Sequence, residues 1–225
     1  MKLKVCGMKY NPKEVAALQP DYLGFIFWER SKRFFEGQLP QLPEQTKKVG
    51  VFVDATISDV LEKIKVYHLD AVQLHGSESV TYCHELKEII SKTKATSNHK
   101  SSIGLATTKI GLIKVFSIKN EFDFSVLAPY EAVCDYFLFD TKGKLPGGNG
   151  YTFDWSVLKN YPSTKPYFLS GGIGPENTDE LLDFLDSPAA KYCHAIDVNS
   201  RFESEPGLKN IEALEEFKKT LITDY

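Results

Sequence analysis

The sequence lacks a surplus of charge of either sign and lacks a long apolar run. Its 225 residues carry 27 basic and 30 acidic side chains, for a formal net charge of −3. Nucleic-acid-binding domains show a clustered basic excess, so nothing here indicates that partner class. No stretch approaches the roughly 18 apolar residues of a membrane span, and residues 1–7 lack the features of a signal peptide. We therefore expect a cytoplasmic globular protein without a nucleic-acid or membrane partner.

Paired metal or redox cysteines are also lacking. The four cysteines are far apart and form no Cys-x-x-Cys motif, so neither a zinc site nor a redox motif is predicted. Disulfides are improbable in a reducing compartment, and buried inert thiols are the default. Only Cys6 lies in surroundings that argue for a chemical role.

Eight short apolar runs, separated by longer and mostly amphipathic stretches, predict parallel strands alternating with helices. The runs lie at residues 3–6, 22–27, 48–53, 71–75, 111–116, 136–139, 167–169 and 195–198. Helices are predicted at residues 56–67, 176–185 and 210–221, and two more begin near Asn11 and Ser77, which suit the N-cap position. Parallel strands need such crossovers.

The number and length of these units favour a single (β/α)8 barrel. Eight units in 225 residues are about 28 residues each, and this α/β fold starts near 200 residues. A doubly wound open sheet is the alternative, but its Gly-x-Gly-x-x-Gly fingerprint is missing after the first strand. No domain boundary is visible. We predict one catalytic domain over residues 1–225, with residues 91–109 as a solvated surface segment or an elongated connection.

Polar and glycine-rich loops after the last two strands predict a phosphate site. In this fold the active site lies at the carboxyl ends of the strands, and loops seven and eight usually hold phosphate. Gly171 and Gly172 would let backbone N–H groups approach an anion, and Asn199 and Ser200 follow the eighth strand. The alternative is a tight turn without a ligand.

A third glycine-rich loop follows the sixth strand. Gly147, Gly148 and Gly150 indicate either a hinged lid over a substrate or an ordinary flexible loop, with equal weight. The pattern alone does not choose between them.

A thiol and a carboxyl group stand on opposite sides of the predicted barrel mouth. Cys6 and Asp140, after the first and sixth strands, can act as base and acid on opposite sides of a sugar. Strand alternation places Lys4 on the same inward face as Cys6, with Asp197 as its candidate partner. A nearby ammonium group favours the Cys6 thiolate. His75 is the one histidine of this polar set, so no metal site is predicted.

Several motifs follow one another along nearly the whole chain. The most specific are the opening Lys4-Val5-Cys6-Gly7-Met8 and the glycine-rich segment at residues 147–155 that ends in Phe-Asp-Trp. The others lie at residues 24–27, 31–33, 49–53, 72–76, 171–177, 197–203 and 206–207. In this order they resemble the phosphoribosylanthranilate isomerase family of tryptophan biosynthesis.

The resemblance implies an Amadori rearrangement of a small-molecule substrate, N-(5-phosphoribosyl)anthranilate, without a cofactor. It implies Cys6 as general base, Asp140 as general acid and Arg33 as the anchor of the anthranilate carboxylate. The other expected contacts are His75 and Asp197 for the substrate, and Gly171, Gly172, Asn199 and Ser200 for its phosphate. Two departures from the family pattern stand out: Asn199-Ser200-Arg201 replaces the usual Ser-Ser-Gly, and a bulky Trp28-Glu29-Arg30 precedes Arg33.

Two other functions are compatible with a barrel of this kind. A related histidine-pathway isomerase acts on a bis-phosphate and needs a second anion-binding loop, but the third strand ends in Asp54-Ala55. A catalytically silent sensor of phosphoribosyl ligands is expected to lack Cys6 or Asp140, and both are present. Monomer and homodimer both stay open.

Overall fold

Eight parallel strands close into a barrel in the computed structural model, which describes residues 1–95, 109–119, 121–141 and 152–223. The strands are β1 (Lys2–Cys6), β2 (Tyr22–Ile26), β3 (Lys47–Phe52), β4 (Ala71–Leu74), β5 (Gly111–Ile118), β6 (Tyr136–Thr141), β7 (Tyr167–Leu169) and β8 (Cys193–Val198). Each pairs with its neighbour in the chain, and Lys4 of β1 lies opposite Asp197 of β8, which closes the ring. The (β/α)8 prediction is confirmed, and the open sheet is wrong.

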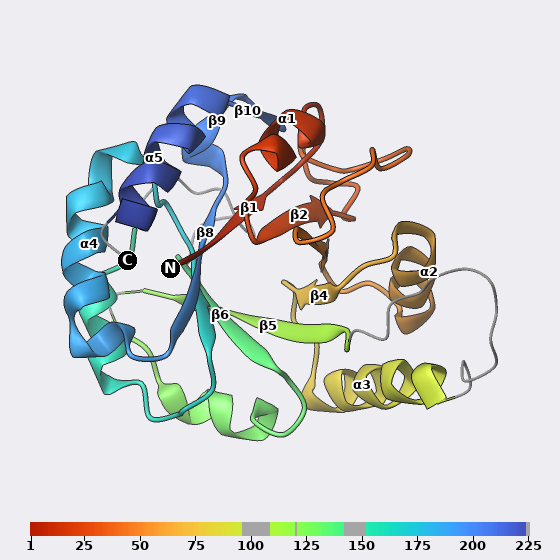
Figure 1. Ribbon diagram of the computed structural model, residues 1–225. Helices are drawn as coiled ribbons and strands as arrows, with labels where there is room; N and C mark the ends of the chain where they lie inside the picture. The colour runs from red at the N-terminus through yellow and green to blue at the C-terminus, as the bar shows by residue number, and fades with distance from the viewer. Residues whose placement is uncertain (96–108, 120, 142–151, 224–225) are drawn as a thin grey trace.

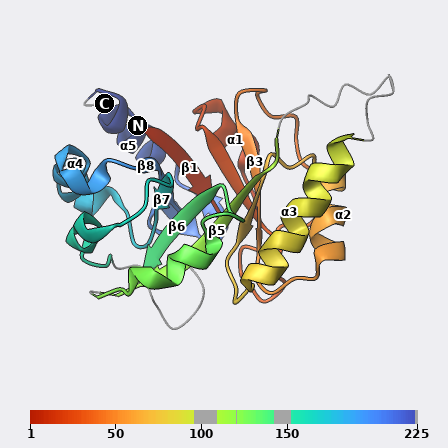
Figure 2. The same ribbon diagram turned by 90° about the horizontal axis from the view of Figure 1, so that it is seen from below.

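Helices cover the outside of this ring (Figure 1). The α-helices among the described residues are α1 (Pro12–Ala17), α2 (Ile57–Tyr67), α3 (Val80–Ala95), α4 (Thr178–Asp186) and α5 (Ile211–Thr223). Helices α2 and α3 lie side by side (Figure 2). After β5 and β6 the chain forms the 3₁₀-helices η1 (Phe124–Tyr130) and η2 (Trp155–Asn160) instead. Pro129 lies within η1 and has no N–H to donate, which disfavours a regular α-helix there.

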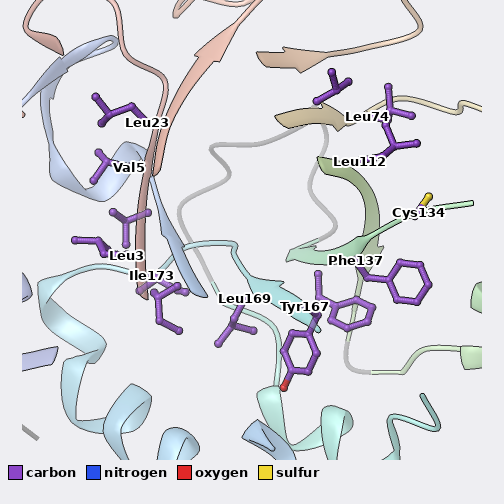
Figure 3. Close-up of a cluster of buried hydrophobic side chains, with 14 of the residues drawn as sticks. Leu3, Val5, Leu23, Leu74, Leu112, Cys134, Phe137, Tyr167, Leu169 and Ile173 are labelled. Atoms are coloured by element: carbon purple, nitrogen blue, oxygen red, sulfur yellow. The ribbon is translucent and has the colours of Figure 1, made fainter. Parts of the chain in front are cut away.

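Strand side chains alternate between two buried clusters, one inside the barrel and one outside it. The inner cluster comprises Tyr22, Val49, Ala71, Ile113, Val115, Leu138, Phe168 and Ala195. The larger cluster packs the outer faces of the strands against the helices. Figure 3 shows its members Leu3, Val5, Leu23, Leu74 and Leu112 pointing away from the middle of the barrel. The barrel is therefore filled, and the inward charged residues Lys4, Asp140 and Asp197 lie toward its carboxyl end.

Asn11 occupies the predicted N-cap position of α1, but its side chain hydrogen-bonds the backbone of Lys209 and makes no cap hydrogen bond. The cap predicted at Ser77 for α3 is wrong. The hydroxyl of Ser79 accepts the hydrogen bond from Tyr82 N instead, while Ser77 N donates to Asp54 Oδ1 after β3. Helix α4 also begins two residues later than predicted, after the 3₁₀-turn η3 (Pro175–Asn177).

A short hairpin follows β8 and lies near the carboxyl end of the barrel. The 3₁₀-turn η5 (Ser200–Phe202) leads into β9 (Glu203–Glu205), which pairs with β10 (Leu208–Lys209). Another 3₁₀-turn, η4 (Pro188–Ala190), precedes β8. No described helix is long and apolar enough to cross a membrane. Residues 91–95, predicted as the start of a surface segment or connection, continue α3, and residues 96–108 lie outside the described residues.

Candidate active site

The carboxyl ends of the strands surround a pocket that collects the residues named from the sequence. Nine of them line it: Cys6, Arg33, His75, Asp140, Gly171, Gly172, Asp197, Asn199 and Ser200. Trp28, from the bulky segment before Arg33, lines it too. Residues far apart in sequence meet here because all strands of a parallel barrel end at the same face. The three candidate lid glycines, Gly147, Gly148 and Gly150, lie outside the described residues.

A buried ion pair spans the closure between β1 and β8. Lys4 Nζ lies 2.8 Å from Asp197 Oδ2, and both side chains are buried. This confirms the partner predicted from strand alternation. Burial alone lowers the pKa of Lys4, but Asp197 and Cys6 raise it by more, so the ammonium stays charged. The other carboxylate oxygen, Asp197 Oδ1, is buried without a hydrogen-bond partner among the described residues.

Cys6 lies beside this pair at the end of β1. Burial raises the pKa of its thiol and Asp197 raises it further, whereas Lys4 and Lys209 lower it, with a net upward shift. Lys4 thus favours the thiolate, as expected, but burial outweighs its effect and Asp197 opposes it. Gly24, opposite Cys6 on β2, makes room for the sulfur, since a Cβ there would lie 2.7 Å from Sγ.

Asp140 is held from two sides within β6, where the sequence had placed it just after the strand. Its Oδ2 lies 3.3 Å from His75 Nε2, and its Oδ1 accepts a hydrogen bond from Thr141 N at 2.9 Å. His75 Nδ1 lies 3.1 Å from Gln73 Nε2. With the Gln73 amide oriented this way, Nδ1 is the acceptor and Nε2 carries the proton that faces Asp140.

Arg33 reaches the pocket from the loop after β2 and forms a hydrogen-bonded ion pair with Glu203 of β9. Arg33 Nε lies 2.9 Å from both carboxylate oxygens, and Nη2 donates to Oε2 at 2.6 Å. Burial raises the pKa of Glu203, but Arg33 and Lys209 lower it by more, so this carboxylate is ionised at neutral pH. Glu203 and Lys209 were not predicted as site residues, although Glu203 ends one of the motifs that carry the family resemblance.

The loops after β7 and β8 form the corner where phosphate is expected. Gly171 and Gly172 have φ of +94° and +71°, in the left-handed region that favours glycine. A Cβ on Gly171 would lie 2.4 Å from the backbone nitrogen of Thr141, so the chain passes too close to β6 for any side chain. Both glycines line the pocket with their backbone exposed to it.

Arg201 joins these two loops, although the family pattern has glycine at its position. Its Nε lies 3.1 Å from Glu176 Oε1, across from loop eight to loop seven. Among the described residues, the only side-chain-bearing positions with positive φ are Gln19, Asp54 and His68. Arg201 therefore adopts a backbone that needs no glycine, and the departure is compatible with an intact loop.

Comparison with known proteins identifies the family of the chain. A family model described as N-(5'phosphoribosyl)anthranilate (PRA) isomerase matches residues 3–103 and 97–220. The N-(5'-phosphoribosyl)anthranilate isomerase of Parabacteroides distasonis is 43% identical over 99% of this chain and 94% of its own. The crystal structure of phosphoribosyl anthranilate isomerase from Thermotoga maritima superposes with a TM-score of 0.78 at 29% identity, over 99% of each chain.

A further solved phosphoribosyl anthranilate isomerase was crystallised in complex with reduced 1-(o-carboxyphenylamino)-1-deoxyribulose 5-phosphate. It has a TM-score of 0.72 and 25% identity, again over 99% of each chain. These matches run from one end of the barrel to the other, as the motifs in the sequence do. The chain belongs to the N-(5'-phosphoribosyl)anthranilate isomerase family of tryptophan biosynthesis.

Proposed function

We propose that this chain converts N-(5'-phosphoribosyl)anthranilate to 1-(o-carboxyphenylamino)-1-deoxyribulose 5-phosphate, with Cys6 as general base and Asp140 as general acid. The observation that carries this proposal is that both groups line one pocket, together with Arg33 and the two glycine- and polar-rich loops. A thiol, a carboxyl group and two separate anion sites match a substrate with one sugar ring, one carboxylate and one phosphate.

The reaction needs two proton transfers on the sugar. Asp140 donates a proton to the furanose ring oxygen, the C1–O bond breaks, and the nitrogen lone pair forms a cationic imine at C1. Cys6 then removes the C2 proton, and the C2–H electron pair moves to give an enolamine. Tautomerisation gives the ketone at C2. Since C2 is oxidised while C1 is reduced, electrons balance within the substrate, and no redox cofactor is expected.

The imine cation explains how a buried thiol becomes a base. In the free pocket, burial keeps the pKa of Cys6 above its ordinary value. A cation that forms close to the sulfur favours the thiolate, because an opposite charge within a few ångströms stabilises the charged form. The base is then generated in the step that needs it.

The remaining contacts follow from groups with free hydrogen-bonding capacity. Asp197 Oδ1 is buried, lines the pocket and has no partner among the described residues, so it can accept a hydrogen bond from a sugar hydroxyl. Arg33 binds the anthranilate carboxylate, and His75 orients Asp140. Backbone N–H groups of the loops at Gly172 and Ser200 bind the phosphate.

A turnover assay on the purified chain tests the activity. With N-(5'-phosphoribosyl)anthranilate, we expect enzyme-dependent loss of the substrate's fluorescence and formation of the deoxyribulose product. Inorganic phosphate should inhibit competitively if the phosphate loops are correctly assigned. A folded chain that leaves the substrate unchanged, under conditions in which the Thermotoga maritima relative converts it, would overturn the proposal.

A further inference from the structure

Beside Arg33 lies a buried group of charges to which the proposed chemistry gives no role. Lys209 of β10 is buried, and its Nζ donates to Asn199 O at 3.0 Å, to Asn199 Oδ1 at 2.8 Å and to Glu203 Oε1 at 2.7 Å. An ammonium group has three N–H donors, and these contacts use all of them. Lys209 therefore acts on its neighbours and is not positioned to bind a substrate.

Glu203 is the centre of this group. Its carboxylate is buried and accepts hydrogen bonds from Arg33, from Lys209 and from Gly207 N at 3.1 Å. The order of charges is thus cation, anion, cation, from Arg33 through Glu203 to Lys209. Because Glu203 is itself fixed by Lys209, its charge-assisted hydrogen bonds restrict the Arg33 side chain far more than a single surface ion pair would.

The contact with Glu203 decides which edge of the Arg33 guanidinium faces the pocket. Glu203 occupies the side-on edge, formed by Nε and Nη2. No hydrogen bond among the described residues uses Nη1, so the end-on edge of Nη1 and Nη2 keeps two parallel N–H groups. Those two groups match a second carboxylate in a bidentate pair.

Gly7 lets the Arg33 and Asn199 side chains lie close to each other, because it has no side chain of its own. It has a φ of +76°, and a Cβ there would lie 2.5 Å from Asn199 Oδ1 and 2.7 Å from Arg33 Cδ. Arg33 and Asn199 both line the pocket, where the proposed function assigns a carboxylate contact to Arg33 and a phosphate contact to the loop of Asn199. Glu203 and Lys209 connect these two residues and are not among the residues that line the pocket.

We propose that Glu203 and Lys209 are positioning residues that fix the orientation of the Arg33 guanidinium and its place beside the Asn199 loop. The pocket thereby favours a substrate that carries a carboxylate in addition to its phosphate. This inference rests on the proposed function, since it assigns the carboxylate to the amine portion of the phosphoribosyl substrate.

The test compares two substrates that differ only in the carboxylate. N-(5-phosphoribosyl)anthranilate has it, and N-(5-phosphoribosyl)aniline, made from aniline and ribose 5-phosphate, does not. Glu203→Gln keeps the side-chain size and removes the charge. It should lower kcat/KM for the anthranilate substrate by about 10- to 100-fold, mainly through KM, and for the aniline substrate by less than about threefold. Glu205→Gln, an exposed carboxylate on the same strand, is the matched control and should change neither value.

Equal losses on both substrates would mean that Glu203 only supports the fold, and no loss on either would mean that Arg33 is positioned without it; both results overturn the proposal. If Glu203→Gln does not fold, Lys209→Gln carries the test, with the same substrate preference expected and a raised inhibition constant for inorganic phosphate. Failure of the wild-type chain to convert the anthranilate substrate is a different outcome, which rejects the proposed function itself.

Discussion

The proposed role of Cys6 as general base requires it to lose a proton in surroundings that oppose a negative charge. Burial and Asp197 both raise the pKa of its thiol, and the two lysines nearby reduce that shift without reversing it. A base of this kind is weak until a positive charge forms beside it, which ties its activation to ring opening. The pH dependence of the free enzyme should therefore show a base that titrates above the ordinary thiol range.

Replacement of Cys6 and of Asp140 tests the separate proton transfers that we propose for them. Cys6→Ser substitutes an alcohol that hardly ionises, and Asp140→Asn removes the transferable proton, so each should lower kcat by roughly 10²-fold or more. In the wild type, the pH profile of kcat should be bell-shaped where chemistry limits turnover, because Asp140 must be protonated and Cys6 must be deprotonated. Cys6→Ser should remove the limb that reports the thiol.

Single-turnover rates across neutral pH give the decisive comparison. Near-normal rates in Cys6→Ser would reduce Cys6 to a packed core thiol. The base would then be sought first at His75, which lies 3.3 Å from Asp140.

Replacement of Arg33 by lysine should weaken substrate binding, because the guanidinium has to bind two carboxylates at once, one along each edge. A guanidinium can bind Glu203 along one edge and the substrate along the other, whereas an ammonium is a single point of charge. Arg33→Lys should raise KM by about tenfold or more with a smaller effect on kcat. Arg30→Lys, on the exposed part of the same loop, is the control. Unchanged KM and kcat would remove Arg33 from the site.

At the scale of elements, one buried ion pair ties three strand ends together. Glu78 accepts hydrogen bonds from Asp54 N after β3, from Gly76 N after β4, and from Lys114 Nζ of β5 at 3.1 Å. Lys114 also donates to Gly76 O at 2.8 Å. The pair lies on the outer side of the strands, next to the loop that carries His75, and both side chains are almost fully buried.

Lys114→Met should therefore destabilise the barrel although it removes a charge from the interior. Glu78 would be left buried without its cation, at a cost of about 3–5 kcal/mol in the free energy of unfolding, measured with urea. Adding Glu78→Gln should restore part of this loss, because the amide oxygen can still accept the backbone N–H groups and no charge is left unpaired. Additive losses in the double variant, or a loss below about 1 kcal/mol in the single one, would contradict the assignment.

Elements proved easier to predict than their ends or their polar contacts. The eight apolar runs identified all the barrel strands, because buried strands need apolar residues whatever surrounds them. Asp140 was placed outside β6 because an acidic residue after an apolar run usually marks its end. Lys4 was recognised as buried from alternation with Cys6, whereas the sequence analysis assigned no buried partner to Lys114 or Lys209. Only the fold brings Glu78 and Glu203 to them, so no local pattern could reveal those pairs.

At the scale of the whole molecule, the two ends of the barrel differ in chemistry. Ring side chains close the amino-terminal end: Phe168 packs edge-on against Tyr22 and Tyr136, with centroids 5.3 and 5.5 Å away. His194 joins them, and its Nε2 lies 2.8 Å from the Tyr22 hydroxyl. These rings form an aromatic plug that fills the amino-terminal end of the barrel, at the opposite end from the pocket.

The plug makes stability depend on pH through His194. Burial lowers the pKa of His194 from 6.5 to about 4, and Lys2 and Lys47 add to the shift. Between these two pH values the unfolded chain binds a proton that the folded chain does not, so the stabilisation is present above pH 6.5 and is lost as pH falls toward 4. After allowance for partial exposure of the ring, the loss should be about 1–2 kcal/mol.

His194→Gln isolates this contribution, since an amide can accept the Tyr22 hydrogen bond but does not titrate. Urea unfolding at several pH values should show the wild type losing about 1–2 kcal/mol more than the variant over this window, because all other titrating groups are common to both chains. Above pH 7 the difference between them should be constant. Parallel curves throughout would mean that the folded barrel accommodates a charged His194 without loss of stability, and would contradict the lowered pKa of this group.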